Sequence, residues 1–318
     1  MKRLISRMFL SCSLIFISCD DVFEEDISDD TIVSIAPKNE ANLTGNAVQF
    51  RWSILEGADN YHLQIIGNQQ KIVLDSLVET DIFEYQIDPG TYQWRVRGEN
   101  FAYVTPYTFV SVFTINSSED LTNQLVTLTS PANNVYLNSE QFSFSWQGIS
   151  TADSYHFRIL EREGTNETQI FEDIAVVDNS INLNNAVIAN DAEYIWEVKA
   201  QNDNSSTSFF RRSFFIDRLA PPIPSIEEPD DEQNFDVDDE VSFSWDFEDS
   251  GAIQSVISGT IEIASDQSFN TIILSNTGTS EQFSTTFTSA GTFYWRVYGE
   301  DEAGNKGDES APRSFTIN

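Results

Sequence analysis

Hydrophobic and polar residues alternate in short runs along most of this chain, and one such run occurs three times. In each copy an aromatic residue, a Trp and a Val stand at positions i, i+2 and i+4, so a β-strand would place all three on one face. Large aromatic and β-branched side chains on one face are typical of a strand that is buried on one side and wet on the other. The three runs are Tyr92–Val96, Tyr194–Val198 and Phe293–Val297.

A second alternating run lies upstream of each copy and also ends in a Trp. These runs are Val48–Trp52, Phe142–Trp146 and Val241–Trp245, so all six tryptophans occupy equivalent positions, two in each repeat. Each repeat also opens with a short apolar run followed by Pro and closes with a run that ends in Ile. A repeat of roughly 100 residues has the length of a whole domain. We therefore expect domains at residues 33–116, 125–217 and 222–318.

Many short strands, separated by turn residues and with almost no helical periodicity, predict an all-β chain of three tandem β-sandwich domains. The connections between them differ in composition. Residues 117–124 are polar, which predicts a flexible linker, whereas residues 217–224 are rich in Pro, which predicts a stiffer one.

The strand that contains the second Trp belongs to a longer string. Tyr-x-Trp-x-Val-x-(Gly/Ala)-x-Asn occurs at residues 92–100 and 194–202, and the third copy has Asp-Glu-Ala-Gly-Asn at 301–305 before its last strand. Together with the Trp of the second strand and the Tyr of the third, these residues resemble fibronectin type III and related bacterial immunoglobulin-like modules. The resemblance covers about residues 33–318 and implies the fold, but such scaffolds serve many roles. The chain departs from the pattern in its extra Trp and in Gly259, which replaces the third-strand Tyr.

The first eighteen residues have the composition of a signal peptide. Three basic residues precede an apolar run, Met8–Ile17, that is too short to span a bilayer, for which about 20 residues are needed. The run ends in Phe-Ile-Ser-Cys, which resembles the lipobox of bacterial lipoproteins. That resemblance implies cleavage after Ser18 and a diacylglycerol attached to Cys19, so that the membrane is a partner. An ordinary secretory signal and an uncleaved anchor are the alternatives.

Residues 20–30 contain seven acidic side chains, and repulsion among them predicts an extended tether over residues 19–32. The run resembles the acidic export signal that follows the lipid-bearing Cys in surface-displayed lipoproteins of some Gram-negative bacteria. A solvated spacer on a lipoprotein that faces the periplasm is the alternative. We expect an outer-membrane location, lipid-anchored and exposed on the cell surface.

The whole chain is strongly acidic. It has 51 acidic and 17 basic residues and a formal charge of −34, so its surface repels nucleic acid phosphates and nucleic acid is excluded as a partner. Acidic chains can be disordered, but 40% hydrophobic residues are enough to build cores.

Candidate chemistry is sparse, and we expect neither an enzyme nor a cofactor. The only histidines, His62 and His156, stand at equivalent repeat positions beside the inward Tyr, so shared ancestry explains them. No Gly-rich phosphate loop, no Gly-x-Ser-x-Gly motif and no His or Cys cluster occurs. Acidic stretches at 230–240 and 301–308 lack the regular loop of a calcium site, and we assign no metal.

The best binding candidate is the aromatic stretch 101–107 between the sixth and seventh strands of the first domain. Loops at this position often carry recognition in sandwich folds. Tyr103 and Tyr107 are therefore candidates to stack on a sugar or anchor a protein partner, the alternative being extra packing at a sheet edge. The sequence thus favours a non-enzymatic surface lipoprotein that binds an extracellular or outer-membrane protein. A carbohydrate-binding accessory protein of an outer-membrane glycan-uptake system is the alternative.

Overall fold

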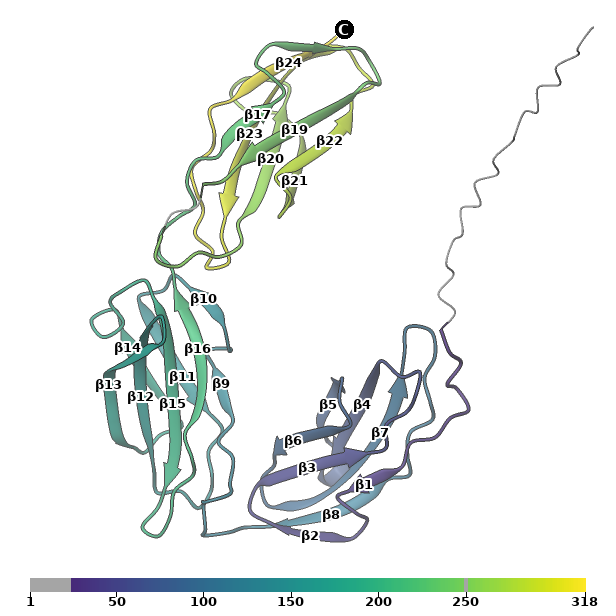
Figure 1. Cartoon of the computed structure of the whole chain (residues 1–318), viewed down its shortest axis with the longest axis vertical. Coiled ribbons are helices and arrows are strands. Elements are labelled where there is room, and N and C mark those ends of the chain that lie inside the picture. The colour runs from purple at the N-terminus through teal and green to yellow at the C-terminus, as the bar shows by residue number, and fades with distance from the viewer. Residues whose placement is uncertain (1–23, 249–250) are drawn as a thin grey trace, which may run out of the picture. The chain divides into compact units, whose positions relative to one another are not determined.

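The computed structural model describes residues 24–248 and 251–318, and these residues form an all-β chain (Figure 1). The strands make six sheets, which pair into three sandwiches, each with one three-stranded and one five-stranded sheet. The predicted fold of three tandem β-sandwich domains is thereby confirmed. The predicted signal peptide and Cys19 lie outside the described residues, and among the described residues no helix is long and apolar enough to cross a membrane.

The first sandwich has the sheet orders β1-β3-β6 and β2-β8-β7-β4-β5. A 3₁₀ turn at Asn68–Gln70 lies between β4 and β5. The strands are β1 (Ser34–Ala36), β2 (Ala41–Thr44), β3 (Ala47–Trp52), β4 (Asn60–Ile66), β5 (Ile72–Val78), β6 (Ile82–Gln86), β7 (Gly90–Glu99) and β8 (Ser111–Asn116).

The second sandwich repeats this order as β14-β11-β9 and β10-β16-β15-β12-β13. Its strands are β9 (Leu128–Ser130), β10 (Val135–Leu137), β11 (Gln141–Trp146), β12 (Ser154–Glu163), β13 (Asn166–Val176), β14 (Ser180–Asn184), β15 (Glu193–Gln201) and β16 (Phe210–Ile216).

The third sandwich has the orders β17-β19-β22 and β18-β24-β23-β20-β21. Its strands are β17 (Ser225–Glu228), β18 (Gln233–Phe235), β19 (Glu240–Asp246), β20 (Ser258–Ala264), β21 (Ile272–Gly278), β22 (Gln282–Thr286), β23 (Gly291–Glu300) and β24 (Arg313–Ile317).

The opening segment of each sandwich belongs to both of its sheets. Its first strand pairs in the small sheet, the chain then passes a Pro and a residue with positive φ, and the next strand joins the large sheet. In the second and third sandwiches that next strand runs parallel to the last strand, with Val135 opposite Phe214 and Gln233 opposite Phe315. One short segment therefore ties the two sheets of each sandwich together.

The predicted alternation places the tryptophans in the cores. All six are at most 4% exposed. In the second sandwich the ring centroid of Phe144 lies 5.4 Å from that of Trp196 and 5.2 Å from that of Phe157. The ring centroids of Trp146 and Tyr155 are 5.3 Å apart. Such tilted and edge-to-face contacts are the favoured geometry of aromatic pairs, so each core is organised around its two tryptophans.

The described part of the predicted acidic tether, residues 24–32, lies against the first sandwich. Ile27 is fully buried and Ile32 nearly so. The carboxylate of Asp26 accepts a hydrogen bond from the backbone N–H of Ser28, and hydrogen bonds from Ser28 lower the pKa of that carboxyl. The charge pattern predicts an extended chain here, but it does not show that the segment also buries apolar side chains.

The same segment recurs before the second sandwich. Leu121, inside the linker that we expected to be flexible, is fully buried in the core of that sandwich. Asp120 accepts a hydrogen bond from the N–H of Thr122, as Asp26 does from Ser28. The sequence Glu-Asp-(Ile/Leu)-(Ser/Thr) at 25–28 and 119–122 is therefore a further repeat landmark, and it forms the folded lead-in of each sandwich.

Truncation of a core tryptophan should destabilise its own sandwich. Trp196→Ala removes a fully buried side chain, which costs about 3–5 kcal/mol, out of roughly 5–15 kcal/mol that a domain of this size holds. In the full chain we expect hydrogen exchange of β11, β12 and β15 to accelerate strongly while the other two sandwiches keep their protection. Val177→Ala, at an exposed position of the same sandwich, is the control and should change little. Uniform protection in the Trp196 variant would contradict the placement of this side chain in the core.

Candidate functional site

The outer face of the five-stranded sheet in the first sandwich carries a polar network. The alternation that turns Trp94 and Val96 into the core turns Arg95 and Arg97 outward on β7. On the neighbouring strand β4, His62 lies opposite Arg97 and Gln64 opposite Arg95. Four polar side chains on two adjacent strands are therefore within reach of one another.

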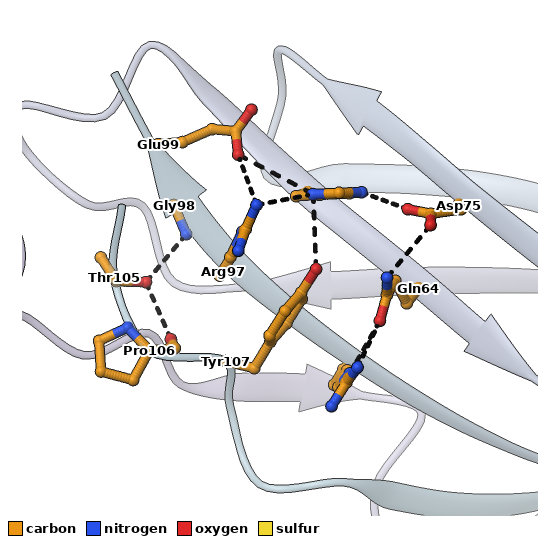
Figure 2. Close-up of polar contacts among 10 residues, drawn as sticks. Gln64, Asp75, Arg97, Gly98, Glu99, Thr105, Pro106 and Tyr107 are labelled. Atoms are coloured by element: carbon orange, nitrogen blue, oxygen red, sulfur yellow. Dashed lines mark hydrogen bonds and ion pairs between the residues drawn. The ribbon is translucent and has the colours of Figure 1, made fainter. Parts of the chain in front are cut away.

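Hydrogen bonds and ion pairs connect this network across three strands (Figure 2). His62 Nε2 contacts the carboxylate of Asp75 on β5. Gln64 Nε2 donates to the same carboxylate at 3.2 Å, and Arg95 Nε donates to Gln64 Oε1 at 2.9 Å. Arg97 donates to His62 Nδ1 at 3.2 Å. Because a guanidinium can only donate, Nδ1 of His62 is the acceptor and Nε2 carries the proton directed at Asp75.

Tyr107, one of the two predicted ligand-binding residues, lies flat across this network. Its ring centroid is 4.3 Å from Cζ of Arg95 and 4.9 Å from Cζ of Arg97, which is the geometry of cation–π contacts. Its hydroxyl is 3.4 Å from His62 Nδ1. Burial raises the pKa of the Tyr107 phenol, although the two arginines oppose this, so the phenol stays protonated at neutral pH. One face of the ring is thus already occupied by the chain itself.

Tyr103, the other predicted residue, is half-buried in the turn after β7. Its N–H donates to the side-chain oxygen of Asn100 at 2.8 Å, and its carbonyl accepts from the N–H of Asn100 at 3.0 Å. The side-chain amide of Asn100 also donates to the carbonyls of Glu25 and Gly57, at 2.9 and 2.8 Å. Asn100 therefore joins the lead-in, the β3–β4 connection and the β7–β8 connection at one end of the sandwich.

The second sandwich repeats both arrangements. Phe209 takes the position of Tyr107. Its ring centroid lies 4.1 Å from Cζ of Arg158 and 5.2 Å from Nζ of Lys199. His156 pairs with Glu172, as His62 does with Asp75. Asn202 donates to the carbonyls of Glu119 and Thr151 at 2.8 and 3.1 Å. An arrangement present in two copies with different side chains fits packing of the sheet face, which is the alternative reading of the aromatic stretch.

The most exposed aromatic side chains near this loop are two phenylalanines, one inside the predicted stretch 101–107 but not singled out there, and one beyond it. Phe101 is 92% exposed and Phe109 is 97% exposed. Their counterparts in the second sandwich are Asp203 and Arg211, which the repeat places 102 residues further along the chain. Comparing the two copies could have identified Phe101 and Phe109 from the sequence. The fold accepts a charged residue at both positions, so an aromatic residue there is not required for packing.

The described residues contain no group of three or more His, Cys, Asp or Glu side chains that could hold a metal ion. The acidic stretches of the third sandwich use their carboxylates in turns. Asp231 accepts hydrogen bonds from the N–H and hydroxyl of Ser314, which lower the pKa of its carboxyl. Asp301 accepts from the N–H and side-chain amide of Asn305.

Comparison with known proteins finds similarity only among solved structures. No protein-family model and no curated protein matches the chain. Among solved structures, the FN1–FN3 domains of chicken CNTN1 are 13% identical with a TM-score of 0.39, covering 90% of this chain and 97% of that one. The fibronectin(III)-like modules of Clostridium thermocellum CbhA are 14% identical with a TM-score of 0.36, covering 61% of this chain and 93% of that one. By strand order and repeated core, this chain consists of three tandem β-sandwich modules.

The position of Tyr107 predicts that it stabilises the first sandwich. Tyr107→Ala removes two cation–π contacts and should lower the free energy of unfolding of this sandwich by about 1–2 kcal/mol. Tyr107→Phe should change it little, because Phe209 fills the same position in the second sandwich. Hydrogen exchange of β4 and β7 in the full chain measures the effect, with Phe109→Ala as the exposed control. Unchanged protection in Tyr107→Ala would instead favour a side chain held free for a ligand.

Proposed function

We propose that this chain is a non-enzymatic lipoprotein of the outer membrane, attached through Cys19 and exposed on the cell surface, that presents its modules for protein–protein interaction. The observation that carries the binding role is the exposure of Phe109 in a strongly acidic, well-solvated protein. A large aromatic side chain kept in water is a typical anchor for a protein partner.

The surroundings of Phe109 support an interaction surface. The N–H of Thr108 donates to the carbonyl of Val96 at 2.8 Å, which places Phe109 back along β7 and away from the turn at Asn100. Val110 beside it is also exposed. In the second sandwich the same position is taken by Arg211, which pairs with Glu167 and Glu197 on the sheet surface. The first sandwich thus has an exposed apolar side chain at the position where the second sandwich has an ion-paired arginine.

A non-enzymatic role is supported by the way the polar side chains are used. Fibronectin type III-like modules generally serve as binding or structural units. The two histidines, which lie on the outer sheet faces of the first and second sandwiches, are each engaged by a carboxylate of the next strand. The resulting network holds the outer face of the sheet rather than an open cleft.

The carbohydrate-binding alternative has less support. All six tryptophans are buried and Tyr107 is covered by two arginines, so the fully exposed rings among the described residues are those of Phe101 and Phe109, which have no polar group to bond a sugar hydroxyl. We therefore place protein–protein interaction first.

The partner role predicts a loss of binding when Phe109 is replaced by the residue that the second sandwich has. Intact cells that display the full chain would be treated with a cross-linker, and captured proteins compared between wild type, Phe109→Arg and the matched exposed control Val177→Arg. We expect specific partners to be lost only from the Phe109 variant, because a charge would replace the anchor. Binding of wild-type protein to a glycan array, with unchanged cross-linking in Phe109→Arg, would favour the carbohydrate alternative.

The anchor predicts a single point of membrane attachment. Cys19→Ala should abolish incorporation of labelled fatty acid and release the chain from the membrane fraction, because the variant has no thiol there for the lipid to be attached to. Protease added to whole cells should digest the wild-type chain. Cys12→Ala, a change inside the predicted signal peptide, is the control and should leave labelling intact. Equal membrane retention of both variants would overturn the lipoprotein assignment.

A further inference from the structure

One end of the first sandwich carries a group of large apolar side chains that are exposed to water. Val33, Ile54, Phe101 and Val104 are 61%, 75%, 92% and 46% exposed, and we name these four residues the apolar pole. They come from three separate segments: the residue just before β1, the β3–β4 connection and the β7–β8 connection. Isolated apolar residues on a surface are ordinary, whereas a group of them marks an interaction site.

Backbone and side-chain hydrogen bonds bring the three segments together. Two hydrogen bonds of 3.0 Å join Ser53 and Val33. The N–H of Ser53 donates to the carbonyl of Val33, and the N–H of Val33 donates to the hydroxyl of Ser53. Ile54 follows directly. The amide of Asn100 donates to the carbonyl of Gly57, and Phe101 follows Asn100. The four side chains therefore share one end of a single sandwich.

The second sandwich shows that the fold does not require apolar residues here. None of the four positions has a large apolar residue in the second sandwich. In the order Val33, Ile54, Phe101 and Val104, the counterparts are Thr127, Gly148, Asp203 and Ser206. The buried tryptophans are by contrast the same in the two copies, and so is the half-buried asparagine of the turn. Of these two sandwiches, only the first has the apolar pole. Packing of the core does not require it.

The position of the lead-in indicates what covers this pole. The carbonyl of Glu25 accepts a hydrogen bond from Asn100, so the chain enters the sandwich at the same end. Cys19 precedes Glu25 by six residues, which reach at most about 20 Å even when fully extended. Any lipid attached to Cys19 therefore holds the pole close to the membrane surface.

We propose that the apolar pole rests on the lipid surface to which Cys19 is attached, with Phe101 and Ile54 at the boundary between headgroups and acyl chains. This inference depends on the proposed lipid anchor. The anchor supplies proximity, and removal of exposed apolar area from water favours the contact. Phe and aliphatic side chains are typical of surfaces that lie in a membrane interface.

Charge restricts the kind of lipid. Glu25, Asp26, Asp29 and Asp30 lie in the lead-in at or near the same end, and anionic headgroups would repel them. We therefore expect contact with a zwitterionic surface, weakened when anionic lipid is added at low salt and partly restored at high salt.

The test uses the full lipidated chain, purified from membranes and reconstituted into phosphatidylcholine vesicles. An environment-sensitive dye is attached at Ala102→Cys, beside Phe101, or at the matched exposed position Asn204→Cys in the second sandwich. Vesicles that carry a nitroxide quencher at the top of the acyl chain should remove most of the emission at position 102 and leave position 204 bright. In the Ala102→Cys background, Ile54→Ser with Phe101→Ser should restore emission to the level seen at 204. These variants change exposed side chains only, so folding is preserved.

Three outcomes would overturn the proposal. Quenching at 102 that survives the two serine substitutions would mean that the tether alone brings the loop near the lipid. Bright emission at 102 on pure lipid vesicles would assign the pole to a protein partner. If the chain without an added cysteine takes up dye and does not float with vesicles, Cys19 carries no lipid, and the anchor and this inference fail together.

Discussion

A β-strand turns successive side chains to opposite faces, and in this chain that geometry determines both the core and the surface of every sandwich. Trp94 and Val96 point inward, so Arg95 and Arg97 must stand side by side on the outer face of the same strand. A shift of one residue in the pairing of β4 with β7 would expose Trp94 and bury the two arginines. The large cost of that exchange holds the register, and the register in turn holds the platform on which Tyr107 lies.

The three copies keep the inward half of this pattern and vary the outward half. In the first sandwich, Tyr107 covers Arg95 and Arg97, and Arg97 pairs with Glu99 at 3.3 Å. In the second, Phe209 covers Arg158, whose guanidinium also pairs with Glu197. In the third, Arg296 pairs with Glu262 and is covered instead by Phe269, from the connection between β20 and β21. The same physical solution, a cation held between a carboxylate and an aromatic ring, is thus reached with different residues.

Much of the fold could be predicted because it depends on periodicity. The strands with paired tryptophans, the three sandwiches and the outward direction of His62 and His156 all follow from alternation. The lead-ins could not be predicted in this way, because one buried Ile27 or Leu121 within a polar stretch has no periodic partner. Their shared Glu-Asp-(Ile/Leu)-(Ser/Thr) sequence becomes informative only when the two copies are aligned beyond the strands.

The loop after β7 shows a second limit. An aromatic stretch predicts recognition, but which rings face water depends on the path of the backbone. Asn100 closes the turn, and the hydroxyl of Thr105 accepts a hydrogen bond from the N–H of Gly98 at 3.1 Å, which directs the following residues over the sheet face. Tyr107 is thereby placed on the arginines, while Phe101 and Phe109 remain exposed. A hydrogen-bonded path of this kind is not visible in the spacing of hydrophobic residues.

The parallel pairing of the second and last strands in the second and third sandwiches has a mechanical meaning. The chain enters each of these sandwiches near one end of this strand pair and leaves near the other, because the two strands run in the same direction. A pulling force applied through the chain therefore acts along the strands, and the hydrogen bonds between Val135–Leu137 and Phe214–Ile216 must fail together rather than one after another. Such a module resists stretching through a short patch of backbone, independently of how much thermal stability its aromatic core provides.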